Sequence, residues 1–254
     1  MDSIQYTEFQ QKVVFVTGGA SGIGFAQVSA FLSQGAKVYV LDNQLRDLEL
    51  FKIQYPTQFD YYLGDVQEKA VLVESVKACN RLFGRIDILL NTVGVLDNYL
   101  PLLETSEATF DRIFTINVKS LFLLTKFILP QMLEQGNGTI ITMTSIAGLV
   151  AGGGGVAYTM SKHALVGFIK QLALDYADQG IHVNGIAPGA IETPMNAADF
   201  AGEGLMAKQV AEETPLKRWA QPKEVADLTL FLASKQANYM QGTIIPIDGG
   251  WTLK

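Results

Sequence analysis

Cysteine and histidine are both scarce in this chain of 254 residues, which contains one Cys and two His. A lone Cys79 excludes an intramolecular disulfide framework and any cysteine-rich metal site. His163 and His182 lie too far apart in the sequence pattern to form a metal site together. The sequence therefore predicts no bound metal, and it predicts that Cys79 packs as a small apolar side chain.

An excess of positive charge is also missing. The chain has 19 Lys and Arg against 25 Asp and Glu, which gives a net charge of −6. Nucleic-acid binding requires a basic face, so this balance argues against a nucleic-acid partner.

Long apolar runs are absent from the sequence. The most apolar stretch, residues 121–133, is interrupted by Lys126 and Pro130 and is too short to cross a membrane. The N-terminal sequence MDSIQYTEFQQ is polar and has no apolar segment like that of a signal peptide. We therefore expect a cytoplasmic protein without a membrane partner.

Charged residues of either sign are few, at 17% of the chain, whereas 48% of the residues are hydrophobic. Intrinsic disorder requires the opposite composition, so it is excluded. A charged fraction below the usual value of about 25% indicates a large core or a surface partly covered by other subunits.

Strand-like and helix-like segments alternate along the chain. Short apolar runs rich in β-branched residues are typical of buried parallel strands, and the segments between them have helical spacing. The predicted strands are 12–17, 37–42, 59–63, 86–91, 138–144, 182–187 and 243–247, and the predicted helices are 23–33, 45–55, 68–83, 109–133, 157–177 and 223–233. The alternation predicts an α/β fold with one doubly wound, Rossmann-type parallel sheet of about seven strands and helices on both faces, forming a single domain over residues 1–254.

The stretch from Ile191 to Gln221 contains no predicted strand. A long segment of this kind within a compact domain more often has a function, such as that of a lid, than serves as an unstructured connection. Gly202 and Gly204 interrupt it, and it offers the apolar side chains of Met195, Phe200, Leu205 and Met206. We expect a mobile substrate lid at residues 191–213.

A glycine-rich loop, Thr17-Gly-Gly-Ala-Ser-Gly-Ile-Gly24, joins the first predicted strand to the first predicted helix. Gly18 permits a tight turn, Gly22 lets the backbone approach a phosphate, and Gly24 lets the helix pack closely. A pyrophosphate at this helix N-terminus would meet free N–H donors and the positive end of the helix dipole. We therefore predict a nucleotide site that includes Ser21 and Ile23 of the same loop.

Asp42 ends the second predicted strand, 18 residues after Gly24. A carboxylate in this place accepts hydrogen bonds from the ribose hydroxyls of an adenosine and repels a 2′-phosphate. No Arg or Lys occurs in the loop or after Asp42 until Arg46, so NAD is predicted rather than NADP. Asp65, after the third strand, could contact the adenine or could equally cap the next helix.

Tyr158 and Lys162 are four residues apart and therefore share one face of a predicted helix. A nearby Lys ammonium favours the phenolate, so we expect the pKa of Tyr158 to be lowered. Tyr158 could then take a hydroxyl proton as hydride leaves carbon, or return it in the reverse reaction. Ser145, at the end of the fifth predicted strand, would hydrogen-bond the same oxygen.

These motifs occur in the order found in short-chain dehydrogenases/reductases, a family that the chain resembles from about Lys12 to Trp251. The matching positions are Thr17–Gly24, Asp42, Asp65-Val66, Asn91–Gly94, Asn117, Ser145, Tyr158 with Lys162, Pro188-Gly189 and Thr193. The resemblance implies that Asn117 holds a water linking Lys162 to solvent, and that Lys162 binds the nicotinamide ribose. It also implies that Val66, Asn91, Gly94, Pro188, Gly189 and Thr193 bind the cofactor.

One motif departs from the family pattern. The usual Asn-Asn-Ala-Gly after the fourth strand is Asn91-Thr92-Val93-Gly94 in this chain. The turn beside the cofactor should survive, because Asn91 and Gly94 remain. The hydrogen bonds of the second Asn are expected to be lost or replaced by Thr92.

The residues favour an NAD-dependent dehydrogenase that acts on a small secondary alcohol or its ketone. An alternative within the family is a 3-oxoacyl-(acyl-carrier-protein) reductase, but the segments before the fifth and sixth strands are acidic or neutral and would not attract an acidic carrier protein. A non-catalytic dinucleotide sensor is the alternative from another class, and it would not need the four residues Asn117, Ser145, Tyr158 and Lys162.

Candidate residues of the substrate pocket lie at 95–100, 149–155 and 191–213. Within the second of these segments, Gly152–Gly155 suggest room or mobility.

The two longest predicted helices, 109–133 and 157–177, have more apolar positions than one sheet contact needs. These positions are Leu121, Leu124, Phe127, Ile128, Leu165, Phe168, Ile169 and Leu172. The family resemblance implies that these helices form a four-helix bundle across a two-fold axis and that residues 244–253 build a second interface, with Trp251 as its anchor. We expect a homotetramer.

Overall fold

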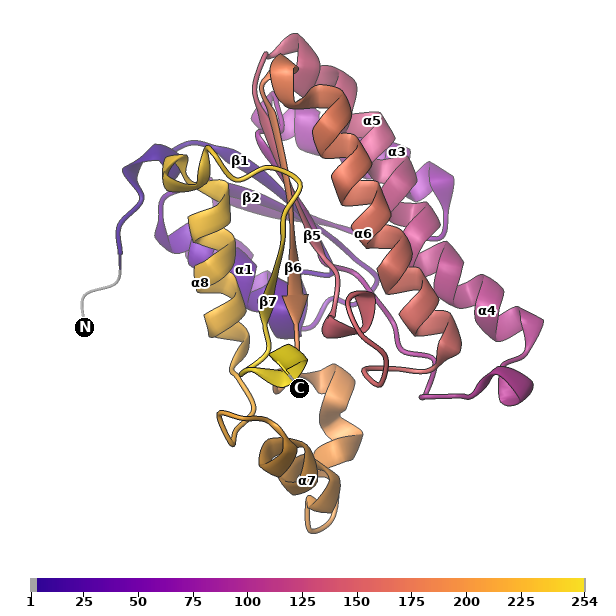
Figure 1. The fold of residues 1–254 in the computed structure, drawn as a ribbon. Helices are drawn as coiled ribbons and strands as arrows, with labels where there is room; N and C mark the ends of the chain where they lie inside the picture. Colours follow the sequence, from indigo (N-terminus) through magenta and orange to yellow (C-terminus); the bar gives the residue numbers. More distant parts are fainter. Residues whose placement is uncertain (1–3, 254) are drawn as a thin grey trace.

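Seven parallel strands form one sheet in the order β3-β2-β1-β4-β5-β6-β7 (Figure 1). The strands are β1 (Val13–Thr17), β2 (Lys37–Asp42), β3 (Phe59–Leu63), β4 (Ile88–Asn91), β5 (Gly138–Met143), β6 (Ile181–Pro188) and β7 (Ile244–Ile247). This computed structural model describes residues 4–253, so residues 1–3 and 254 of the predicted domain lie outside the described residues. The prediction of a doubly wound, Rossmann-type parallel sheet is confirmed.

The strand order reverses between β1 and β4. Thr17, the last residue of β1, lies opposite Leu41 of β2 and Asn91 of β4. In open α/β sheets the loops leaving such a pair of strands diverge to opposite faces and leave a crevice beyond the carboxyl ends of the strands. The glycine loop and the Asn91–Gly94 turn therefore open at the same edge.

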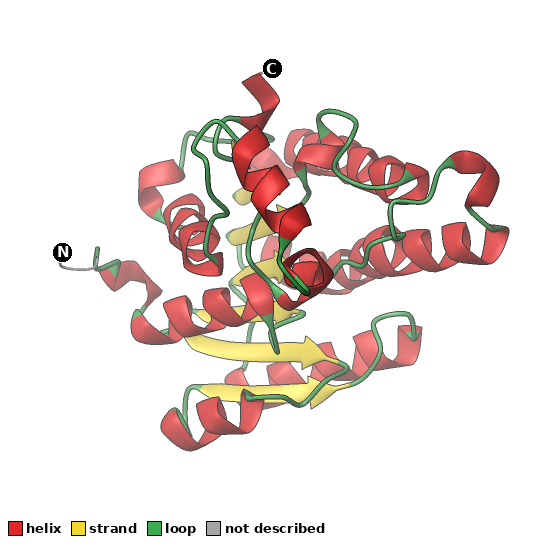
Figure 2. Ribbon diagram, turned by 90° about the horizontal axis from the view of Figure 1, so that it is seen from below, coloured by secondary structure: helices red, strands yellow, loops and turns green. Residues whose placement is uncertain are grey.

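Helices cover both faces of the sheet (Figure 2). On one face α1 (Gly22–Ser33) packs against α8 (Pro222–Ala233), with α2 (Leu48–Gln54) beside them. The other face carries α3 (Lys69–Phe83), α5 (Ser120–Glu134) and α6 (Val156–Tyr176). Alternate residues of β1 serve the two layers, since Val14 and Val16 lie in one core and Val13 and Phe15 in the other.

The predicted helix at 109–133 is one long helix with an irregular turn inside it. It consists of α4 (Glu107–Phe114), a π-helical turn at Thr115–Lys119 and α5. By length and composition alone, residues 107–134 could cross a membrane. However, Leu124, Ile128 and Met132 of α5 lie in the core against the sheet, and the core helix of a water-exposed protein passes the same test.

The predicted lid region contains helices that the sequence analysis did not assign. A 3₁₀ segment, η6 (Pro194–Phe200), is followed by α7 (Leu205–Glu213), and Gly202 and Gly204 between them both have φ of +62°. The nine residues of α7 contain too few apolar repeats for their spacing to indicate a helix. Below the sheet in Figure 1, α7 stands apart from the two main layers.

Candidate active site

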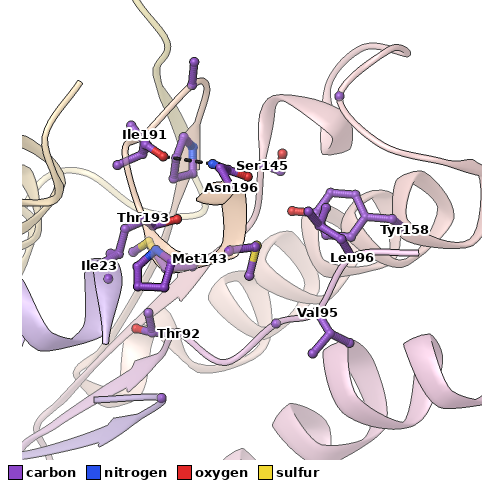
Figure 3. A pocket seen from close by; sticks show the side chains of 18 of the residues that line it. Ile23, Thr92, Val95, Leu96, Met143, Ser145, Tyr158, Ile191, Thr193 and Asn196 are labelled. Carbon is purple, nitrogen blue, oxygen red and sulfur yellow. Dashed lines mark hydrogen bonds between the residues drawn. The ribbon is translucent and has the colours of Figure 1, made fainter. Parts of the chain in front are cut away.

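A cleft of about 830 Å³ opens at the carboxyl ends of the strands, where the strand order reverses. Its walls come from the glycine loop, the residues after β2, β4 and β5, the start of α6, and residues between Pro188 and Trp219. The volume lies within the usual range for cofactor and small-molecule sites. Figure 3 shows Ser145, Tyr158, Thr193 and Thr92 from four different segments around this one space.

The glycine loop needs glycine at some positions for its backbone conformation and at another for close packing. Gly18 and Gly22 have φ of +74° and +54°, which favours glycine. A Cβ on Gly24 would lie 2.1 Å from the carbonyl oxygen of Gly18, so the first turn of α1 can rest on the loop only without a side chain there. Within the described chain, the hydroxyl of Ser21 makes no capping hydrogen bond to α1. The first residues of α1 line the cleft, so the N–H groups of the helix N-terminus lie beside it.

Asp42 is held at the edge of the same loop. Its Oδ2 accepts a hydrogen bond from the N–H of Ala20 at 2.9 Å, and its Oδ1 accepts one from the N–H of Gln44 at 2.9 Å. Each carboxylate oxygen can accept a second bond, and Asp42 lines the cleft. The N-terminus of α1 could hold a phosphate, and the fixed carboxylate of Asp42 beside it could hold a ribose. This arrangement fits the adenosine end of a dinucleotide.

Positive charge is sparse around the cleft. Among the described residues that line it, Lys162 is the single cation, whereas Asp42, Asp199 and Glu213 are acidic. Arg46 is exposed and its Nε donates a hydrogen bond to Oε1 of Gln44. The lining therefore presents a carboxylate and no cation at the place predicted for the ribose.

Three residues predicted from sequence do not line the cleft with their side chains. Asp65 accepts hydrogen bonds from the N–H of Gln67 at 2.9 Å and from its side-chain amide at 3.0 Å, so it closes a turn while its neighbours Gly64 and Val66 line the cleft. Asn91 is buried and donates to the hydroxyl of Thr125 at 3.3 Å. The remaining predicted cofactor residues, Gly94, Pro188, Gly189 and Thr193 among them, lie on the wall.

Thr92 replaces the missing Asn with a different set of hydrogen bonds. Its hydroxyl donates to Oε1 of Gln27 at 2.7 Å, and its N–H donates to the hydroxyl of Thr17 at 3.0 Å. Gln27 in turn donates to Thr229 of α8 at 3.0 Å. The turn after β4 is thereby tied to β1 and α1, so of the two outcomes expected for the missing Asn, loss or replacement of its bonds, the structure shows replacement by Thr92.

Asn117 is the third predicted residue outside the wall, and it lies in the π-helical turn, fully buried. Its Oδ1 accepts the N–H of Val95 at 2.8 Å, and its amide donates to the carbonyl of Val95 at 3.0 Å and to Ser161 at 3.1 Å. A Cβ on Gly94 would lie 3.3 Å from Lys162 Nζ and 3.7 Å from Asn117 Oδ1, so both groups face Gly94. Asn117 thus joins the turn after β4 to α6 on the side of Lys162.

Ser145, Tyr158 and Lys162 meet at the other end of the cleft. Ser145 and Tyr158 both line the cleft, and both side chains project into the pocket in Figure 3. Lys162 Nζ donates to the carbonyl of Met143 at 3.0 Å and lies 5.5 Å from the centre of the Tyr158 ring. The spacing of four residues therefore places both groups on the cleft side of α6, as predicted.

Burial dominates the electrostatics of this pair. It raises the pKa of Tyr158 to about 12, assisted by the charges of Tyr99 and Asp97 and opposed by the hydrogen bond from Ser145. It also lowers the pKa of Lys162 to about 8. The expected lowering of the Tyr158 pKa is wrong for the chain by itself, because the loss of hydration on burial destabilises the phenolate.

The substrate side of the cleft is largely apolar. Leu96, Tyr99, Ile146, Met195, Met206, Val210, Trp219 and Trp251 line it. Phe200 does not reach the wall and packs on Trp219, with ring centroids 4.9 Å apart. The sequence did not predict Trp219 as a cleft residue. Its position near the strand ends depends on the β-bridge between Ile191 and Ala220, which has no signature in the sequence. Trp251, expected to anchor an interface, also lines the cleft.

Comparisons with known proteins cover nearly the whole chain. A family model described as enoyl-(acyl carrier protein) reductase matches residues 18–252. An uncharacterized oxidoreductase of Thermotoga maritima is 38% identical over 260 residues, covering 96% of this chain and 98% of that protein. A 3-oxoacyl-(acyl-carrier-protein) reductase of the same organism is 36% identical over 250 residues, covering 95% and 98%. The crystal structure of levodione reductase superposes with a TM-score of 0.91 at 32% identity, covering 96% of this chain and 99% of that one.

Proposed function

Because this chain belongs to the short-chain dehydrogenase/reductase family, whose members are oxidoreductases that use nicotinamide dinucleotides, we propose that it is an NAD-dependent dehydrogenase of secondary alcohols or their ketones. The observation that carries the proposal is the meeting of Ser145, Tyr158 and Lys162 in the cleft that also contains the glycine loop. Asp42, with no cation beside it among the described residues that line the cleft, supports NAD over NADP.

In the proposed reaction the protein residues handle the proton. A bound nicotinamide dinucleotide supplies the hydride acceptor or donor. Tyr158 takes the proton of the substrate hydroxyl during oxidation and returns it to the carbonyl oxygen during reduction. The Ser145 hydroxyl holds that oxygen by a hydrogen bond, and Lys162 stabilises negative charge on Tyr158. Asn117 holds the segment beside Lys162 in place, through Val95 and Ser161.

The lining of the cleft favours a small neutral substrate with an apolar body. Aromatic and sulfur-containing side chains supply most of the substrate side, and its charged groups, Asp199 and Glu213, would repel an anion. The same two carboxylates argue against an acidic carrier protein at the mouth of the cleft. We further propose that the enzyme acts in the cytoplasm.

A turnover assay tests the proposal. We would measure NADH and NADPH formation with a panel of sugar alcohols, diols, cyclic alcohols and hydroxysteroids, and consumption with the matching ketones. The proposal expects turnover of at least one neutral secondary alcohol with NAD. Cofactor binding without turnover across the panel would instead indicate a dinucleotide sensor.

A further inference from the structure

Asp97 is a buried carboxylate that the mechanism above does not use, and only 2% of its surface is exposed. Its Oδ1 accepts hydrogen bonds from the N–H of Gly155 at 2.8 Å and of Tyr99 at 3.2 Å. Its Oδ2 accepts the N–H of Tyr158 at 2.8 Å. The segment after β4 thereby holds the backbone of the proposed acid–base residue.

These bonds have the geometry of a helix cap supplied from elsewhere in the chain. The N-cap residue of α6 is Gly155, which has no side chain to accept the N–H groups of the first turn, and Tyr158 is the third residue of the helix. An N-cap side chain normally accepts the N–H of the second or third helical residue, and a negative charge there also interacts favourably with the helix dipole. Asp97 does both from a position 61 residues before Tyr158 in the sequence. The N–H of Val156 donates to the carbonyl of Leu100 at 3.2 Å and adds a second attachment.

Gly155 is required because Asp97 occupies the space beside it. A Cβ there would lie 2.6 Å from both carboxylate oxygens of Asp97 and 2.6 Å from the N atom of Leu100. Its φ of −75° suits any residue, so the demand for glycine is one of space and not of backbone conformation. The sequence suggested room or mobility at Gly155, and the structure shows close packing instead.

The same carboxylate also holds the opposite wall of the cleft. Asn98 and Tyr99 have φ of +57° and +59°, in the left-handed region that is unfavourable for a bulky residue. The hydrogen bond from the N–H of Tyr99 to Asp97 stabilises this turn, and Tyr99 lines the cleft. Two tyrosines from separate segments are therefore held by one side chain.

We propose that Asp97 is a positioning residue for the reaction, which holds Tyr158 and the Tyr99 wall in one relative geometry. This inference rests on the proposed function, because it concerns the efficiency of Tyr158 as the acid–base group. A cap that served stability alone would lower the melting temperature without slowing turnover by the folded enzyme.

The pH profile provides a second readout, because Asp97 acts on Tyr158 through its charge as well as through its hydrogen bonds. The groups facing Tyr158 are Asp97 and Tyr99 from the segment after β4, Lys162 from α6 and Ser145 from the residue after β5. The negative charge of Asp97 raises the pKa of Tyr158. Neutralising it should therefore shift the rise of the oxidation rate with pH to lower pH, by roughly half a unit.

The test compares Asp97→Ala and Asp97→Asn with the wild type. Asp175→Ala is the matched control, because Asp175 is an exposed carboxylate near the other end of α6. The proposal expects kcat to fall at least about tenfold in Asp97→Ala, less in Asp97→Asn, with a change in KM for NAD below about threefold. Hydrogen exchange should accelerate in residues 153–160 and stay unchanged in the strands, and the pH profile of Asp97→Asn should shift as stated.

A kcat within about twofold of the wild type, or exchange that accelerates equally across the sheet, would overturn the proposal. Gly155→Ala provides a second variant if Asp97→Ala does not fold, because its Cβ should displace the carboxylate and reproduce the loss of kcat. Absence of turnover in the wild type would contradict the proposed function instead. The exchange measurement would then still decide whether Asp97 holds the start of α6.

Discussion

At the scale of single residues, burial acts in opposite directions on Tyr158 and Lys162. It raises the pKa of the phenol to about 12 and lowers the pKa of the amine to about 8, so the chain by itself favours the neutral form of both groups above pH 8. The spacing of four residues predicts that the two side chains meet, but it carries no information on how deeply they are buried. The positions were therefore predictable from the sequence, and the direction of the Tyr158 shift was not.

The buried amine of Lys162 costs stability, which gives a prediction with a definite sign. The unfolded chain binds the proton up to pH 10.5 and the folded chain only up to about pH 8, so the penalty is complete below pH 8 and is relieved as the pH rises to 10.5. A pKa shift of this size corresponds to a destabilisation of the folded state by about 3 kcal/mol at neutral pH. A variant without the amine would escape this penalty but would lose the hydrogen bond to the carbonyl of Met143, which offsets about 1–2 kcal/mol of the gain.

Lys162→Met should therefore raise the melting temperature at pH 7 by roughly 2–4 °C, although it removes activity. Differential scanning calorimetry from pH 7 to pH 10 would show the gain shrinking as the pH rises. A variant that is less stable than the wild type at pH 7 would contradict this interpretation of the buried amine.

Asp42 carries the prediction of cofactor preference. The wild type should have a higher kcat/KM for NAD than for NADP, because a fixed carboxylate without a neighbouring cation in the cleft lining repels a 2′-phosphate. Asp42→Ala should weaken NAD and reduce the discrimination by about tenfold or more, as measured by steady-state kinetics with both cofactors. A wild-type preference for NADP would refute the assignment.

At the scale of elements, the strands were predictable from short apolar runs rich in β-branched residues, and most helices from the helical spacing of their apolar residues. Two features were not. The π-helical turn at Thr115–Lys119 adds a residue inside a continuous helical pattern, and α7 is too short to show a period. The role of Asp97 was not predicted for a related reason. Its carboxylate accepts hydrogen bonds from backbone N–H groups 58 and 61 residues away, and such contacts leave no local pattern in the sequence.

The segment 191–213 is predicted to close over bound ligands. Met195 and Met206 line the cleft yet are 49% and 55% exposed, and the two glycines before α7 provide a hinge. Hydrogen exchange in residues 194–213 should slow when NADH and a substrate analogue bind, because closure would bury these apolar side chains. Equal exchange with and without both ligands would mean that the segment is a fixed wall.

At the scale of the whole molecule, the argument for a homotetramer changes. Four of the apolar positions counted as surplus on the two long helices lie in the protein's own core, so the surplus is smaller than the sequence suggested; they are Leu124, Ile128, Ile169 and Leu172. What remains is a groove of about 360 Å³ between the helices, lined by Phe114, Val118, Phe122 and Phe168. Phe122 is 48% exposed.

The tetramer remains a prediction from the family resemblance and this groove. Light scattering at micromolar concentration should give about four times the chain mass of 27.7 kDa. Phe122→Asp should reduce that mass to that of a smaller assembly, because burying a carboxylate at the interface is unfavourable. A monomeric wild type would contradict the prediction, and a dimer would leave one of the two interfaces.

The central claim concerns the enzyme as a whole, namely that Tyr158 exchanges the substrate proton while the rest of the cleft holds NAD. It is tested most directly by measuring turnover and NADH binding in the wild type and in Tyr158→Phe, which removes one phenolic oxygen. We predict that the variant loses more than nine-tenths of kcat while its Kd for NADH, measured by fluorescence titration, changes by less than about threefold. A Tyr158→Phe enzyme that keeps more than about a tenth of kcat would contradict acid–base catalysis by Tyr158.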